Sequence, residues 1–153
     1  RDCAAAGAQR VLVVTSAPIA ELAAAVTNPL EAAGVACRVW AGPDGEPTIA
    51  HFEDALAAAR EHGADFVIGL GGGSAMDVAK LVAALADGSQ SFGDVVGIGL
   101  LAGRRLPLAC VPTTAGTGSE ATPITATQAA APPMKTPRMT RTKISRNSSR
   151  GTE

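Results

Sequence analysis

Three consecutive glycines, Gly71 to Gly73, constrain the fold of this 153-residue chain more than any other feature of its sequence. They follow the apolar run Phe66–Ile68, which predicts a buried strand, and they precede a helix-forming run that begins at Ser74. Glycine adopts positive φ and lets the backbone approach a ligand closely. A helix N-terminus offers unpaired N–H groups and the positive end of a dipole, which suit a phosphate. The pattern predicts a strand–turn–helix unit with a phosphate site, and a tight connection without a ligand is the alternative.

The helix after the glycines is expected to begin with Ser74 as its N-cap, because Asp77 stands three residues later at the spacing of a capping box. Val78, Val82 and Leu85 then recur at helical spacing and predict an apolar face. Burial of this face would fix the direction in which the helix N-terminus points. The same face would serve any α/β core, so it indicates architecture and not chemistry.

A second polar loop follows a second apolar run, at residues 106–110. It carries the hydroxyls of Thr113, Thr114, Thr117 and Ser119. Hydroxyls and exposed N–H groups can hydrogen-bond the base edges, the ribose or the phosphates of a nucleotide. Ligands of open α/β sheets bind outside the carboxyl ends of the strands, so we expect both loops at one edge of the sheet. The alternative is a Ser/Thr turn that caps only its own backbone.

Apolar runs and capped helical runs alternate along the chain, and this order predicts an α/β fold with a mostly parallel, open, Rossmann-like sheet. Asn28 and Pro29 are expected to restart a short helical turn, with Asn28 as N-cap and Pro29 at the first position. Thr48 is expected to cap a helix that Gly63 ends. Strands are expected at 11–15, 35–40, 66–70 and 106–111, and helices at 18–26, 48–62 and 74–86.

The two loops together resemble one family. The segment Gly-Leu-Gly-Gly-Gly-Ser-Ala-Met-Asp-Val-Ala-Lys at 69–80, followed by Pro-Thr-Thr-Ala-Gly-Thr-Gly-Ser-Glu-Ala-Thr-Pro at 112–123, is similar to the iron-containing (group III) alcohol dehydrogenases. The resemblance covers residues 10–125 or so. It implies a dehydroquinate-synthase-like N-terminal domain that binds NAD or NADP, without its helical second domain. In the parent enzyme the second domain holds Fe²⁺ or Zn²⁺, and the reaction interconverts an alcohol and its aldehyde or ketone.

The resemblance also implies which residues contact the dinucleotide. It places Gly72, Gly73 and Ser74 at the pyrophosphate, and Asp77 in the lining of the cleft. It places Thr113, Thr114, Thr117 and Ser119 along the rest of the cofactor. Ser16 follows the first strand, where many members of the family carry an acid that binds the ribose 2′-hydroxyl and repels a 2′-phosphate. Because Ser16 is neutral, we expect NADPH to be accepted.

We expect neither a metal site nor a catalytic residue in this chain. Its two histidines, His51 and His62, lie eleven residues apart on one expected helix, and therefore about 16 Å apart along its axis. One ion cannot bridge that distance. The resemblance implies that one Asp and usually three His of the second domain hold the metal, so this chain alone is expected to be inactive.

Charge divides the chain near Gln128. Residues 1–128 carry 7 Lys/Arg and 13 Asp/Glu, whereas residues 129–153 carry 6 Lys/Arg and one acid. We expect 1–128 to be an NAD(P)-binding domain, incomplete at its N-terminus because the first residue is Arg1, and 129–153 to be a basic, disordered tail. A basic tail could bind nucleic acid or anionic lipid. We prefer an extension without an evolved partner, such as the product of a frame change, and expect no nucleic-acid or membrane partner.

Cysteine usage and the lack of targeting signals indicate a cytoplasmic protein. No run of 18 apolar residues predicts a membrane span, and nothing at the start resembles a signal peptide. Cys3, Cys37 and Cys110 are odd in number and far apart, which is typical of small buried hydrophobic residues in a reducing compartment. The small-molecule partners implied by the resemblance are a nicotinamide dinucleotide and an alcohol or aldehyde, and a homo-oligomer is possible.

Two other interpretations stay open. The first is a relative on the same scaffold, namely glycerol dehydrogenase, maleylacetate reductase or dehydroquinate synthase, although their glycine turns differ from Gly-Gly-Gly-Ser-Ala-Met-Asp at 71–77. The second is a non-catalytic nucleotide-binding module whose basic tail meets a partner. A metal-binding, His-rich helical domain in the rest of the protein would favour the enzyme over the module.

Overall fold

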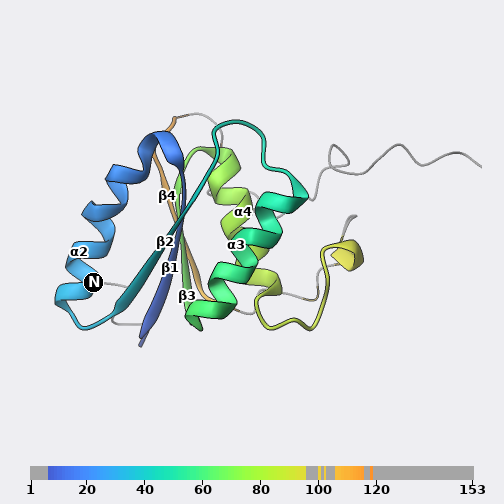
Figure 1. Ribbon diagram of the computed structural model, residues 1–153, viewed down its shortest axis with the longest axis horizontal. Coiled ribbons are helices and arrows are strands. Elements are labelled where there is room, and N and C mark those ends of the chain that lie inside the picture. The colour runs from blue at the N-terminus through green and yellow to red at the C-terminus, as the bar shows by residue number, and fades with distance from the viewer. Residues whose placement is uncertain (1–6, 96–99, 101, 103–105, 116–117, 119–153) are drawn as a thin grey trace, which may run out of the picture.

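Four parallel strands form one open sheet in a computed structural model that describes residues 7–95, 100, 102, 106–115 and 118 (Figure 1). The strands are β1 (Arg10–Ser16), β2 (Ala36–Gly42), β3 (Phe66–Gly71) and β4 (Leu108–Pro112). Their order across the sheet is β2-β1-β3-β4, and each neighbouring pair is parallel. The expected α/β fold with a parallel, open, Rossmann-like sheet is confirmed. The expected strand at 106–111 begins two residues later, at Leu108.

Helices cover both faces of this sheet (Figure 1). The 3-10 helix η1 (Ala17–Ala23) leads directly into α2 (Ala24–Ala32) on one face, and α3 (Ile49–His62) and α4 (Gly73–Leu85) lie on the other. A short 3-10 turn, η2 (Gly93–Val95), follows α4. No helix within the described ranges is both long enough and apolar enough to span a bilayer.

The central strand β1 shows why its sequence is continuously apolar. Leu12 and Val14 belong to the buried cluster with α3 and α4, whereas Val11 and Val13 belong to the cluster with α2. All four side chains are fully buried. A parallel strand covered by helices on both faces needs apolar residues at every position, because neither face meets water.

Close packing of α4 on β3 depends on Gly69. A Cβ atom added at Gly69 would lie 2.9 Å from the Cβ of Ala79 and 3.3 Å from the Cα of Met76. The helix therefore rests directly against the backbone of the strand. Burial of Val78, Val82 and Leu85 contributes about 1.5–3 kcal/mol each, as expected for full burial of such side chains. This packing fixes the position of the α4 N-terminus at the carboxyl end of β3.

The expected limits of α3 are confirmed. Thr48 Oγ1 accepts a hydrogen bond from His51 N, and His51 Nδ1 accepts one from Thr48 N, each at 3.3 Å. The pair forms a capping box in which histidine stands where glutamate is usual. At the other end, Gly63 adopts the left-handed conformation with φ of 63° and closes the helix.

The expected break at Asn28 and Pro29 is wrong, because Pro29 lies inside α2. Ala23, Thr27 and Leu30 are buried at intervals of four and three residues, so one helical face packs against the sheet through the proline position. A proline inside a helix removes one backbone hydrogen bond. Tertiary packing of the face outweighs that loss, which a local pattern of capping residues cannot reveal. The helix expected at 18–26 is 3-10 helix as far as Ala23, and the α-helix α2 begins at Ala24.

Candidate functional site

The two polar loops lie side by side at the carboxyl ends of β3 and β4. Gly71 pairs with Pro112 in the register of these strands, and Thr113 N donates a hydrogen bond of 3.0 Å to Gly71 O. The expectation that both loops share one edge of the sheet is therefore confirmed. From β1 the chain passes to β2 on one side, and then crosses to β3 on the other side of β1. Ligands of such sheets bind at this switch point.

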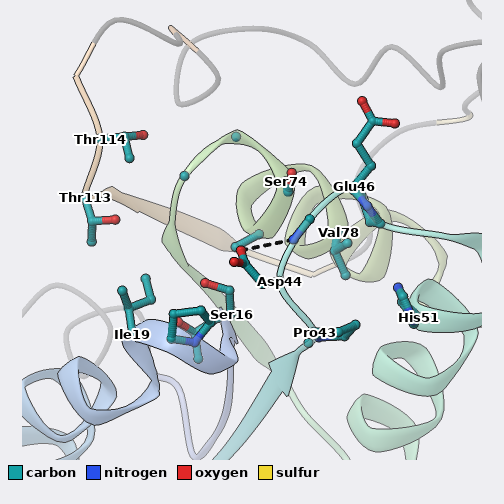
Figure 2. A pocket seen from close by; sticks show the side chains of 18 of the residues that line it. Ser16, Ile19, Pro43, Asp44, Glu46, His51, Ser74, Val78, Thr113 and Thr114 are labelled. Carbon is teal, nitrogen blue, oxygen red and sulfur yellow. Dashed lines mark hydrogen bonds between the residues drawn. The ribbon is translucent and has the colours of Figure 1, made fainter.

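A cleft of ≈ 440 Å³ opens at this edge (Figure 2). Its volume falls within the range of about 300–1,000 Å³ that is usual for small-molecule sites. Its walls come from the ends of β1 and β2, the loop before α3, the first turn of α4 and the loop after β4. The lining includes Thr15, Ser16, Pro18, Ile19, Trp40, Gly42, Pro43, Asp44, Gly45, Glu46, Pro47, His51, Gly72, Gly73, Ser74, Ala75, Val78, Thr113 and Thr114.

Gly71 leaves little room for a side chain, and a side chain at Gly72 would extend toward the second loop. Gly71 has φ of 145°, and a Cβ there would lie 3.1 Å from the Cβ of Ala75. A Cβ on Gly72 would lie 3.4 Å from Thr114 Oγ1, so it would narrow the gap between the two loops. Glycine here keeps the backbone of one loop close to the hydroxyl of the other. A ligand between the loops would therefore meet backbone on one side and hydroxyls on the other.

The first turn of α4 is open toward the cleft. Gly72 is the N-cap, no side chain caps the helix, and Met76 N makes the first intrahelical bond, to Gly72 O at 3.2 Å. The N–H groups of Gly73, Ser74 and Ala75 thus have no intrahelical acceptor, as in any first turn. The expectation that Ser74 is the N-cap is wrong, because Gly72, two residues earlier, takes that position. The uncapped N-terminus leaves these N–H groups available to an anion.

Six of the expected site residues line the cleft: Ser16, Gly72, Gly73, Ser74, Thr113 and Thr114. Asp77 is not part of the lining. Its carboxylate accepts a hydrogen bond of 3.1 Å from Lys80 Nζ, and the lysine side chain is only 6% exposed. Thr117 and Ser119 lie outside the described residues, as does the expected basic tail at 129–153. Contact of each of these residues with a cofactor stays a prediction.

Sequence reasoning missed the wall formed by the loop between β2 and α3. Trp40, Asp44 and Glu46 all line the cleft from this side, together with His51 of the α3 capping box. Trp40 is held by a hydrogen bond of 2.7 Å from its Nε1 to Asp54 Oδ2. The signal was present, because a strand at 35–40 parallel to the first strand must end at the same edge. The polar loop after that strand was therefore a candidate wall of the site.

One polar atom of the cleft wall is buried without a partner. Thr15 Oγ1 has no hydrogen bond in the described part of the structure, and the residue is 1% exposed. A buried hydroxyl without a partner costs about 1–3 kcal/mol. It lies at the carboxyl end of β1, next to Ser16, where the ligand site of an open sheet is expected.

Among the described residues, no group of three or more His, Cys, Asp or Glu is placed to hold a metal ion. His62 Nε2 lies 3.2 Å from Ala36 O, and His51 serves the capping box, so each histidine already has a structural contact. These residues do not fit the donor set of an iron site. The side chains of Cys37 and Cys110 are half-buried, which is more exposed than the sequence suggested.

These features define a class: an α/β domain with a parallel sheet, a glycine turn at a helix N-terminus and a ligand cleft at the switch point. The family model described as iron-containing alcohol dehydrogenase matches residues 1–143. The chain belongs to the iron-containing alcohol dehydrogenase family. This confirms the resemblance, although the match runs past the expected domain boundary at residue 128, which stays a prediction.

Individual relatives agree with this assignment. The chain is 42% identical to long-chain-alcohol dehydrogenase 1 of Geobacillus thermodenitrificans over 77% of its own length and 31% of that protein. An iron-containing alcohol dehydrogenase of Thermotoga maritima matches with a TM-score of 0.66 and 34% identity, over 75% of this chain and 33% of the other. Sulfoacetaldehyde reductase of Bifidobacterium kashiwanohense, solved with NAD⁺, matches with a TM-score of 0.66 and 29% identity, over 79% of this chain and 32% of the other. The chain thus spans about a third of the length of these relatives.

Proposed function

We propose that this chain is the nucleotide-binding part of an NAD(P)-dependent alcohol dehydrogenase, and that the cleft of Figure 2 holds the dinucleotide. The observation that carries the proposal is the uncapped N-terminus of α4 within the lining of the cleft, beside the hydroxyls of Thr113 and Thr114. The structure of a relative with NAD⁺ supports the choice of ligand. In the whole enzyme, the dinucleotide would accept hydride from an alcohol or donate it to an aldehyde or ketone.

Different residues of the cleft would bind different parts of the dinucleotide. The N–H groups at the start of α4 would hold the pyrophosphate, because they lack intrahelical acceptors and the helix dipole favours an anion there. Gly72 lets the phosphate approach the backbone, since a side chain would fill the gap toward Thr114. The hydroxyls of Thr113 and Thr114 would bind further polar groups of the cofactor. Thr117, Ser119 and Asp77 belong to the proposed site through the family resemblance alone.

The metal of the proposed enzyme would be held elsewhere, because the described residues do not fit an iron site. We propose iron as that metal, with zinc as the alternative, and a small alcohol or aldehyde as substrate. The family description supports iron. We further propose that the enzyme is cytoplasmic and that it can assemble as a homo-oligomer.

The single tryptophan of the chain provides a direct test. Trp40 lines the cleft, so NADH bound there would quench its fluorescence by energy transfer to the reduced nicotinamide or by direct contact with the cofactor. We expect saturable quenching of the 153-residue chain by NADH, competed by NAD⁺. The matched variant Gly72→Val should bind at least tenfold more weakly, because its side chain enters the gap toward Thr114.

A control variant outside the cleft lining separates binding from general damage. Gly93→Ala adds a Cβ that only reaches 3.8 Å from Ser91 Oγ, so its quenching curve should match that of the parent chain. Quenching that is absent, or that Gly72→Val leaves unchanged, would contradict the proposed function.

A further inference from the structure

The charges around the cleft are unevenly distributed. Among the described residues that line it, two are acidic, Asp44 and Glu46, and none is a lysine or an arginine. Both acids stand on the loop between β2 and α3, opposite the first turn of α4 (Figure 2). Asp44 and Ser16 both line the cleft, whereas the Glu46 side chain extends away from Ser16 in Figure 2. The wall near Ser16 is therefore acidic, although Ser16 itself is neutral.

The backbone brings Asp44 next to the end of β1. Ser16 and Gly42 are partners in the register of β1 and β2, so the loop that carries Asp44 begins directly beside Ser16. Asp44 Oδ1 accepts a hydrogen bond of 3.0 Å from Gly45 N. Gly45 has φ of 107°, a conformation that few other residues adopt, and it permits this tight turn. Within the described structure, Oδ2 of Asp44 accepts no hydrogen bond, so it is available to a ligand.

A carboxylate in this position discriminates between two forms of ribose. It accepts hydrogen bonds from ribose hydroxyls, as the acids of other dinucleotide sites do. A 2′-phosphate offers no such donor, and its charge of about −1.5 to −2 at pH 7 would be repelled by the acid. A phosphorylated ribose needs a cation, and the described lining supplies neither a lysine nor an arginine.

We infer that Asp44 makes this site selective for the dinucleotide without a 2′-phosphate, so that NADH binds more tightly than NADPH. Asp44 thereby supplies, from the loop after β2, the acid that is missing at Ser16. The inference rests on the proposed function and deepens it. It replaces the expectation that NADPH is accepted. That expectation followed from the neutral Ser16 and considered only the position after the first strand. We expect a preference for NADH of at least about tenfold, which corresponds to about 1.4 kcal/mol.

Calorimetric titration of the 153-residue chain with NADH and with NADPH tests the inference. The variant Asp44→Asn removes the charge but retains an oxygen that can accept from Gly45 N, so the turn should persist. It should bind NADPH at least fivefold more tightly than the parent chain does, and its preference for NADH should fall below threefold. Added salt should reduce the preference of the parent chain, because the discrimination is electrostatic.

Two control variants identify the charge responsible. Glu53→Gln removes an exposed carboxylate of α3 that lies outside the cleft lining, and should leave the ratio of the two affinities unchanged. Glu46→Gln should change the ratio less than Asp44→Asn does, because Glu46 extends away from Ser16. Equal affinities of the parent chain for NADH and NADPH, or a ratio that Asp44→Asn leaves unchanged, would overturn the inference while the proposed function stands. Failure of both nucleotides to bind would overturn the proposed function, and the inference with it.

Discussion

Replacing Gly69 with alanine should disturb the contact that positions the nucleotide-binding helix. The added Cβ would lie 2.9 Å from the Cβ of Ala79 and 3.3 Å from the Cα of Met76, and neither atom belongs to a flexible side-chain end. Helix α4 must therefore move away from β3. Overpacking of this kind costs about 1–3 kcal/mol. Alanine also lowers the conformational entropy of the unfolded chain, which stabilises the folded state by about 0.4–1 kcal/mol. The expected net loss of stability is thus on the order of 1–2 kcal/mol.

Ala79→Gly provides the matching partner for a double-mutant cycle. Alone it should also destabilise, because glycine inside a helix costs about 1 kcal/mol and a buried methyl group is lost. In the double variant the 2.9 Å contact no longer exists, so the combined loss should be smaller than the sum of the single losses by about 1 kcal/mol. Urea unfolding followed by far-ultraviolet circular dichroism measures all four free energies. Gly93→Ala, whose added Cβ would make only an ordinary contact of 3.8 Å with Ser91 Oγ, is the control and should change stability by less than about 0.5 kcal/mol.

Additive losses in this cycle, within about 0.3–0.5 kcal/mol, would refute the reasoning. They would mean that the strand and the helix do not meet at these two positions. The site would then lack the packing contact that we hold responsible for the position of the α4 N-terminus.

Three further outcomes follow from individual contacts. Thr48→Ala should destabilise the fold by about 1 kcal/mol in urea unfolding, because the α3 cap loses the hydroxyl that accepts from His51 N. Ser91→Ala should raise the pKa of Asp94 in an NMR titration, since hydrogen bonds from Ser91 N (2.8 Å) and Ser91 Oγ (2.7 Å) hold this pKa below its usual value. Because the pKa is lowered in the folded state, these bonds stabilise the fold above the unfolded pKa of Asp94, and their contribution is lost as the pH falls through the folded value. Finally, the 153-residue chain with Fe²⁺ or Zn²⁺, NAD⁺ and small alcohols should show no turnover by absorbance of reduced cofactor, and metal-dependent reduction would show that catalytic groups were misplaced.

The sequence predicted the fold well where one local signal agreed with the tertiary packing. The apolar run of β1, the cap at Thr48 and the left-handed Gly63 all lie where the pattern placed them. The prediction failed at Pro29, because the buried stripe through Leu30 continues one helix across a residue that usually ends one. It also failed by two residues at the N-cap of α4, where Gly72 takes the position that was predicted for Ser74, a residue type that favours it.

Part of the candidate site, namely the glycine turn and the threonine loop, was predicted because local signals again agreed with the tertiary packing. The glycine turn and the threonines are adjacent to strong strand signals, and the rule for parallel sheets brings them together. Asp44 was not found, because its role depends on the register of Ser16 with Gly42 and on the turn at Gly45. Such long-range register is set by the packing of the whole sheet and cannot be obtained from the spacing of residues along the chain.

Residue-resolved NMR titration with NADH tests the central claim most directly, because it asks whether the two loops and the end of β1 form one dinucleotide site. The account predicts that amide signals of Gly72, Gly73, Ser74, Thr114 and Ser16 shift together and follow one binding curve. Signals near the amino ends of the strands, such as that of Asp65 directly before β3, should not move. Shifts that are absent from the glycine turn, or that follow different curves for the two loops, would contradict the account.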